Sequence, residues 1–172
     1  MDTIESARLR LRPLTEADAE FICGLLNEPS FLQQIGDRGV RDLDSAKRYI
    51  ADGPQAMYAE HGLGLLLVEL KTVAGTGGEP IGMCGLLQRP TLPEPDLGYA
   101  LKPAHWGRGY ALEACAATLA WGRRARGIER VIAIVSPGNS PSIKVLEKLG
   151  MRREGRREMK PGDEVMIYGV AR

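Results

Sequence analysis

The 172-residue chain is 44% hydrophobic and 26% charged, a composition that fits a globular protein and excludes a disordered or fibrous one. Its 23 basic and 22 acidic residues almost balance, so the overall charge favours neither nucleic acid nor a membrane surface as a partner. Three widely spaced cysteines without a Cys-x-x-Cys pair predict buried thiols in a reducing compartment: Cys23, Cys84 and Cys115. The N-terminal residues do not have the pattern of a secretory signal, so we expect the cytoplasm.

The first predicted elements are a strand and two helices. Basic and apolar residues alternate over residues 8–14, which predicts a half-buried strand. Thr15 and the acidic residues after it predict a helix start, and the helix should run to about Asn27. A second helix is expected over residues 44–51, ending near the Asp-Gly-Pro at 52–54.

The rest of the chain alternates strands and helices. Apolar patterns and turn residues predict strands over residues 63–70, 80–87, 96–101, 130–135, 151–158 and 164–170, and helices over 110–126 and 140–149. The first two of these strands are joined by a glycine-rich loop over residues 73–79, and a proline-rich loop over 88–95 precedes the third. This order predicts one α/β domain built on a mixed sheet.

The turn between the strand at 96–101 and the helix at 110–126 is the most informative segment. It contains Gly107 and Gly109, and its backbone N–H groups should converge at the start of the helix. Such unpaired donors, together with the positive end of the helix dipole, form a site for a phosphate or pyrophosphate. A P-loop would need Gly-Lys followed by Ser or Thr, and a dinucleotide fingerprint would need a small residue at Leu112. The sequence therefore disfavours both of those nucleotide sites.

Residues 99–114, Tyr-Ala-Leu-Lys-Pro-Ala-His-Trp-Gly-Arg-Gly-Tyr-Ala-Leu-Glu-Ala, resemble the acetyl-CoA pyrophosphate turn of the GNAT superfamily. A second match follows, Asn-Ser-Pro-Ser at 139–142 and then residues 145–151. A third is the opening Arg-Leu-Arg-Leu-Arg-Pro at 8–13 with Asp18. The three matches are correctly ordered and extend over most of the chain. They are most similar to the branch that includes ribosomal-protein N-terminal acetyltransferases.

This resemblance implies the GNAT fold, an α/β architecture with flanking helices and a mixed, mostly antiparallel sheet of about seven strands. The fourth and fifth strands, at 96–101 and 130–135, should splay apart in a V, and the pantetheine arm of acetyl-CoA should enter the gap. Residues 1–172 would then form a single acetyl-CoA-binding N-acetyltransferase domain.

The resemblance also implies how acetyl-CoA, the acyl donor, is held. Main-chain amides of the turn would bind the pyrophosphate, so Trp106 in place of the usual Gln or Arg matters little. The exposed backbone of the splayed strand and Asn139 would bind the pantetheine arm, and Arg108 and Lys148 are candidate partners of the ribose phosphate. The implied cofactor-binding residues are Tyr99, Ala100, Leu101, Trp106, Gly107, Arg108, Gly109, Tyr110, Ala111, Asn139 and Ser142.

Two side chains are candidates for catalysis. Many GNAT enzymes have a tyrosine seven positions after the asparagine, where this chain has Leu146. The resembling branch instead has a serine three positions after it, here Ser142, whose hydroxyl would hydrogen-bond the departing sulfur. A serine is also common in the first turn of a helix for structural reasons alone. Asp96 is the candidate general base acting through water, with water alone as the alternative, and Glu113 should support the turn.

The expected function is transfer of acetyl from acetyl-CoA to a primary amine by direct transfer in a ternary complex. A protein N-terminus and a small-molecule amine both remain open as acceptors. The alternative is a non-catalytic acyl-CoA-binding or interaction module on the same fold. We expect no metal, no nucleic-acid partner and no membrane partner, and a homodimer is a possible assembly.

Overall fold

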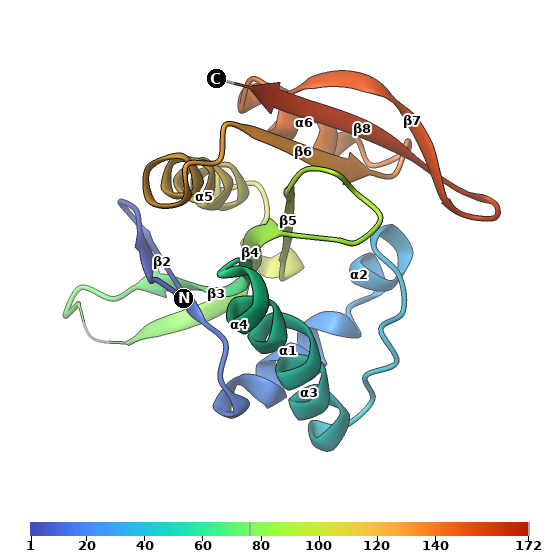
Figure 1. The fold of residues 1–172 in the computed structure, drawn as a ribbon. Helices are drawn as coiled ribbons and strands as arrows, with labels where there is room; N and C mark the ends of the chain where they lie inside the picture. The colour runs from blue at the N-terminus through green and yellow to red at the C-terminus, as the bar shows by residue number, and fades with distance from the viewer. Residues whose placement is uncertain (76, 172) are drawn as a thin grey trace.

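The computed structural model describes residues 1–75 and 77–171, in which one sheet of eight strands has helices on both faces (Figure 1). Thr76, in the predicted glycine-rich loop, and Arg172, at the end of the predicted domain, lie outside the described residues. The strands are β1 (Ile4–Glu5), β2 (Leu9–Pro13), β3 (Gly64–Lys71), β4 (Gly78–Leu87), β5 (Asp96–Leu101), β6 (Arg130–Val135), β7 (Arg152–Lys160) and β8 (Asp163–Ala171). The helices are α1 (Ala19–Leu26), α2 (Pro29–Gln34), α3 (Leu43–Ile50), α4 (Ala56–His61), α5 (Tyr110–Arg126) and α6 (Ser140–Lys148).

The strands lie in the order β1-β2-β3-β4-β5-β6-β8-β7. Neighbouring strands are antiparallel except β5 and β6, which are parallel. The predicted mixed, mostly antiparallel sheet is therefore confirmed. The strand beyond the predicted seven is β1, which has two residues and pairs with β2. None of the helices in the described part of the chain is both long and apolar enough to span a membrane.

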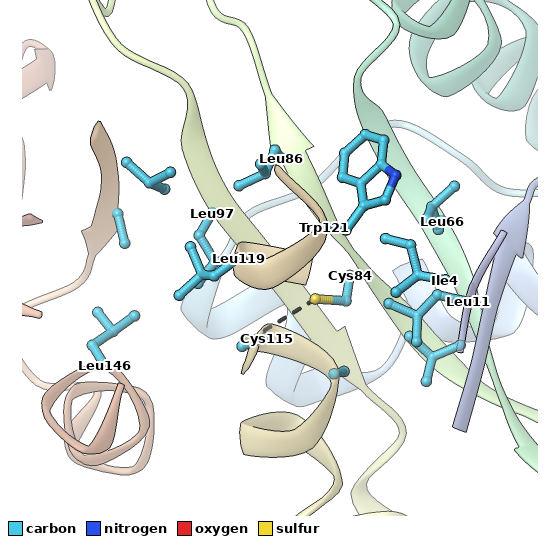
Figure 2. Packing of buried hydrophobic residues seen from close by; sticks show 14 of the residues in the cluster. Ile4, Leu11, Leu66, Cys84, Leu86, Leu97, Cys115, Leu119, Trp121 and Leu146 are labelled. Atoms are coloured by element: carbon cyan, nitrogen blue, oxygen red, sulfur yellow. Dashed lines mark hydrogen bonds between the residues drawn. The ribbon is translucent and has the colours of Figure 1, made fainter. Parts of the chain in front are cut away.

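Two apolar clusters cover the two faces of the sheet. On one face α5 and α6 pack against the strands, as Figure 2 shows for Cys115 and Leu119 of α5 and Leu146 of α6. On the other face α1 and α3 pack against Leu67 of β3 and Met83 of β4. The side chains of β5 alternate between these two clusters, because successive residues of a strand point to opposite faces.

The parallel strands β5 and β6 pair at one position in the described structure, where Asp96 lies opposite Ile132. The Ile132 N–H donates to the carbonyl of Pro95 at 3.0 Å. Beyond this point the two strands diverge (Figure 1), while β5 stays in register with β4 along its other edge. The predicted V-shaped splay is present, and it leaves the β6-facing edge of β5 without a strand partner.

The N-terminal helical region differs from the prediction at three points. The predicted helix start at Thr15 forms a 3-10 turn (Glu16–Asp18) before α1 begins, and the short helix α2 was not predicted. The helix expected to end at residues 52–54 instead continues through a π-helical segment (Ala51–Gln55) into α4. The wider π turn accommodates the buried Pro54, whose ring would clash with a regular helix.

Tertiary contacts explain why α4 forms. Its Tyr58 hydroxyl accepts a hydrogen bond from the Leu14 N–H at 3.2 Å and donates to the carbonyl of Leu65. These bonds fix α4 against β3, and the helix ends at Gly62, which adopts the left-handed conformation with φ of 64°. Local propensity after Pro54 is therefore overridden by contacts with distant segments.

The cysteines follow the prediction in two cases out of three. Cys84 and Cys115 are buried, with their sulfur atoms 3.9 Å apart, whereas Cys23 on α1 is half-buried. Burial raises the pKa of Cys115 well above its ordinary value, so this residue stays a thiol.

A corner between β2 and α1 is closed by Arg12. Its guanidinium donates to Asp18 at 2.8 and 2.9 Å and to Glu69 at 2.9 Å. Both carboxylates are less than a tenth exposed. Burial alone would raise the pKa of Asp18, but the hydrogen bonds from Arg12 and Thr15 outweigh it and lower that pKa below its ordinary value. This corner is an ion-paired network in which one guanidinium binds two buried carboxylates.

Candidate active site

The turn before α5 is built on two left-handed glycines. Gly107 has φ of 74° and Gly109 has φ of 80°, a region that other residues rarely adopt. A Cβ at Gly107 would meet no atom within 4 Å, and one at Gly109 would meet only the Arg8 guanidinium at 3.3 Å. Backbone conformation, not crowding, therefore requires glycine here.

The same turn leaves a row of backbone donors open. Within residues 1–75 and 77–171, the N–H groups from Gly107 to Leu112 have no hydrogen-bond acceptor. Intrahelical bonding resumes at Glu113, whose N–H donates to the Gly109 carbonyl at 3.1 Å. The residue before α5 is Gly109, which has no side chain to cap these amides. Converging amides at the positive end of a helix dipole suit an anion such as a pyrophosphate.

Arg8 and Glu113 hold the turn in place. Glu113 accepts hydrogen bonds of 2.7 Å from the Ser6 hydroxyl, the Arg8 N–H and the Arg8 Nε. Arg8 also donates to the carbonyl of Arg108 at 2.9 Å, and its guanidinium lies 4.5 Å from the centre of the Tyr110 ring. Burial acts to raise the pKa of Glu113, but these hydrogen bonds outweigh it and lower that pKa. The supporting role predicted for Glu113 fits this geometry.

Sequence reasoning missed Arg8 as part of the turn. It belongs to the predicted opening motif, but its partner Glu113 lies 105 residues further along the chain. The sequence shows an arginine early in the chain but does not indicate its partner. The partner is identified only by the packing of β1 and β2 beside α5.

Trp106 and His105 link the turn to the end of β5. The Trp106 indole N–H donates to the Leu101 carbonyl at 2.9 Å, while 53% of the residue stays exposed. His105 lies in a 3-10 turn (Pro103–His105), and its Nε2 is 3.6 Å from Glu79. The turn is thus fixed to the strand that leads into it.

Tyr99 and Ser142 contact each other between β5 and α6. Their hydroxyl oxygens are 2.8 Å apart, although the residues lie on β5 and on the first turn of α6. Asn139 caps α6 by accepting from the Ser142 N–H at 3.3 Å. Burial raises the pKa of Tyr99 to about 12, so its hydroxyl remains protonated. Leu146, at the position of the tyrosine found in many relatives, is buried in the core.

Asp96 lies on the opposite face of β5 from Tyr99, because the two positions are three residues apart on a strand. Its carboxylate is fully buried and accepts from the Arg89 Nε at 3.1 and 3.2 Å. Burial raises the pKa of Asp96, and the charge of Arg89 opposes that effect. The two candidate catalytic residues are therefore separated by the strand.

The two candidates for the ribose phosphate, Arg108 and Lys148, are both exposed. Arg108 is an exposed residue of the turn, whereas Lys148 is exposed on the last turn of α6. Glu94, on the loop before β5, is paired with Arg130 at 3.1 Å. Among the described residues, no three His, Cys, Asp or Glu side chains are grouped so that they could hold a metal ion.

Comparisons with known proteins agree with this geometry. A protein-family profile described as an Acetyltransferase (GNAT) domain matches residues 8–152. The protein YkkB of Bacillus subtilis (strain 168) is 33% identical over 149 residues, which are 84% of this chain and 81% of that protein. An N-acetyltransferase p20 of Bacillus licheniformis is 28% identical over 156 residues, 90% of this chain and 85% of that protein.

Solved structures share the fold over nearly the whole chain. The acetyltransferase from Agrobacterium tumefaciens str. C58 is 30% identical, with a TM-score of 0.83 over 100% of this chain and 95% of that chain. Mycobacterium smegmatis RimJ, solved in complex with CoA-disulfide, has a TM-score of 0.83 at 22% identity, over 99% of this chain and 87% of that chain. At that identity the likeness is one of fold. The profile match and the arrangement of turn, splay and α6 lead to one conclusion: this chain belongs to the GNAT family and is an acetyl-CoA-dependent acetyltransferase.

Proposed function

We propose that the protein transfers acetyl from acetyl-CoA to a primary amine, by direct attack of the amine on the thioester in a ternary complex. The observation that carries this proposal is the row of open amides from Gly107 to Leu112, which follows directly on the unpaired edge of β5. A CoA molecule with its pyrophosphate at these amides and its pantetheine arm along β5 brings its thioester between β5 and α6.

The binding residues follow from that placement. The open amides of residues 107–111 take the pyrophosphate, whereas the Trp106 N–H already donates to the Pro103 carbonyl at 3.1 Å. The backbone of residues 99–101 and the Asn139 side chain take the pantetheine arm. For the ribose phosphate we favour Arg108, because it lies in the turn itself. Lys148 is six residues beyond Ser142, which is about 9 Å along the axis of α6.

The proposed chemistry needs little from the protein at the amine itself. A chain-terminal amine has a pKa near about 8 and is partly neutral at physiological pH, whereas a lysine near about 10.4 needs a base. The neutral amine attacks the thioester carbon, which is held near the β5 backbone, and the sulfur leaves beside Ser142. We propose that Ser142 donates a hydrogen bond to that sulfur.

Asp96 is proposed as the base, acting through a water molecule. A raised pKa suits this role, because a stronger base accepts a proton more readily. Because Asp96 is buried beside Arg89, this role requires that water reaches its carboxylate from the face of β5 opposite Tyr99.

Ligand-dependent unfolding tests the proposal first. Acetyl-CoA or CoA at about 100 times its dissociation constant should stabilise the fold by about 2.7 kcal/mol, and NAD should have no effect. A panel of amines, with thiol release and the mass of the acceptor as readouts, then identifies the acceptor class. Stabilisation by CoA without acetylation of any amine would contradict the amine acceptor while leaving the CoA site intact.

A further inference from the structure

The Ser142 hydroxyl is held by a neighbour on the facing strand and not by its own helix. A serine in the first turn of a helix commonly bonds to nearby backbone, which would be the purely structural reason for its presence. Here the Ser142 Oγ instead lies 2.8 Å from the Tyr99 hydroxyl, 43 positions away in the sequence. The contact joins β5 to α6, the two elements between which the thioester is proposed to lie.

The direction of this hydrogen bond is assigned from the surroundings and the acidity of the Tyr99 phenol. The phenol is packed against the core cluster between β5 and α5, and Cys84 lies opposite Tyr99 on β4. In the described structure Ser142 is the hydrogen-bond partner of the phenol. Either hydroxyl has the geometry to donate, but the phenol is the more acidic of the two and therefore the better donor, so we assign Tyr99 as the donor and Ser142 as the acceptor, which leaves the Ser142 proton for another acceptor.

We propose that the Tyr99 hydroxyl fixes the Ser142 hydroxyl as a hydrogen-bond donor to the sulfur of the departing CoA, which makes Tyr99 a positioning residue for acetyl transfer. This inference rests on the proposed transferase function and on the placement of the thioester in the gap. It also accounts for Leu146, because Ser142, held by the Tyr99 hydroxyl from β5, supports the sulfur in place of a hydroxyl from the next turn of α6.

Both hydroxyls keep their protons throughout this step. The amine nitrogen forms a bond to the thioester carbon, the carbon–sulfur bond breaks, and its electron pair leaves on the sulfur. The surplus proton of the amine passes to water. Tyr99 and Ser142 donate hydrogen bonds in series, and each bond in such a chain polarises the next.

The experiment measures the pKa of the CoA thiol bound to the protein, from the ultraviolet absorbance of the thiolate. In the wild type this pKa should lie below that of free CoA. Ser142→Ala should raise it by about 1, since a hydrogen bond to a charged group contributes that much or more. Tyr99→Phe should raise it by about half as much, and the double variant should match Ser142→Ala, because Tyr99 acts through Ser142.

Tyr168→Phe is the matched control. Tyr168 is a buried tyrosine of β8 in the same core cluster, so its variant also loses a buried hydroxyl but leaves the gap unchanged. It should leave the thiol pKa at the wild-type value. If Tyr99→Phe and Tyr168→Phe give the same thiol pKa, or if the double variant is additive, the inference is wrong.

Steady-state kinetics with an accepted amine separate this inference from the proposed function. Tyr99→Phe should lower kcat several-fold with little change in the KM for acetyl-CoA, whereas a merely structural loss would change both. If no amine is acetylated, the proposed function fails. The thiol titration still decides the role of Tyr99 in that case, because it needs only bound CoA.

Discussion

The start of α5 and the corner between β2 and α1 differ in whether their polar groups have partners within the described residues. At the corner, Arg12 pairs with two buried carboxylates, and Asp18 also accepts from the Thr15 N–H at 2.8 Å. At the start of α5, the capping position is Gly109, and the amides that follow have no acceptor within the described residues. The closed corner stabilises the fold. The open helix start is suited to a ligand, since the protein has left its donors uncommitted.

The largest expected effect is a loss of folding stability when the ion-paired corner at Arg12 is broken. Arg12→Ala leaves Asp18 and Glu69 buried without a counter-charge, so the free energy of unfolding should fall by about 3–5 kcal/mol. Urea denaturation measures it. Arg10→Ala is the control on the same strand: its ion pair with Glu5 is 3.6 Å long and about half exposed, so the loss should stay below about 1 kcal/mol. Equal losses for the two variants would show that the Arg12 network contributes no more to stability than an exposed ion pair does.

Replacing Asp96 distinguishes a catalytic role of its carboxylate from a purely structural role in the buried ion pair with Arg89. As a base, it predicts that Asp96→Asn lowers kcat by about 100-fold and removes the acidic limb of the pH–rate profile. As a closed pair with Arg89, it predicts a loss of folding stability alone. We expect the kinetic loss, and measuring kcat against pH together with urea denaturation separates the two. Unchanged kcat in a destabilised variant would leave water as the base.

The open helix start is tested by placing the same side chain at both ends of α5. Gly109 and Gly127 both have left-handed backbones, with φ of 80° and 64°, so a tryptophan at either should cost about 1–2 kcal/mol of folding free energy. Only Gly109→Trp should also abolish the stabilisation of about 2.7 kcal/mol by excess CoA, because only it obstructs the amides. Thermal unfolding with and without CoA measures both effects. Normal CoA binding by Gly109→Trp would place the pyrophosphate elsewhere.

The smallest expected effect concerns the support of that helix start and its pH dependence. The pKa of Glu113 is lowered in the folded state, so its stabilising contribution is complete above its ordinary value of 4.5 and is lost as the pH falls through the folded-state pKa. Glu113→Gln should cost about 1–2 kcal/mol at neutral pH and progressively less below about pH 4. Urea denaturation at several pH values measures the difference. Glu147→Gln, at an exposed position on α6, is the control, and its cost at neutral pH should stay below about 0.5 kcal/mol.

Sequence reasoning located the glycine turn before α5 because its signal is local. The conformation of Gly107 and Gly109 and the start of α5 depend on residues within one short segment. The same holds for the turn between β7 and β8 and for the stop of α5 at Gly127. Single elements with a strong apolar period or a glycine stop were therefore predictable within a few residues.

The features that the sequence did not predict share one cause, which is contact between residues that are not neighbours in the chain. The continuation into α4 depends on Tyr58 reaching Leu14, 44 positions away. The pairing of Asp96 with Arg89 depends on how the loop before β5 folds back, and the sequence showed only two charged residues near one another. Neither residue type nor spacing indicates which of these partners meet.

The sequence by itself determined the glycine turn and the strongly periodic elements, because glycine positions and apolar periods act over a few residues, and its resemblance to the GNAT superfamily implied the family and the splayed strands. Tertiary structure alone decided that Arg8 braces Glu113 and that Tyr99 meets Ser142. Those side chains are brought together by the register of the sheet and the packing of α5 and α6, and the sequence carries no local record of either.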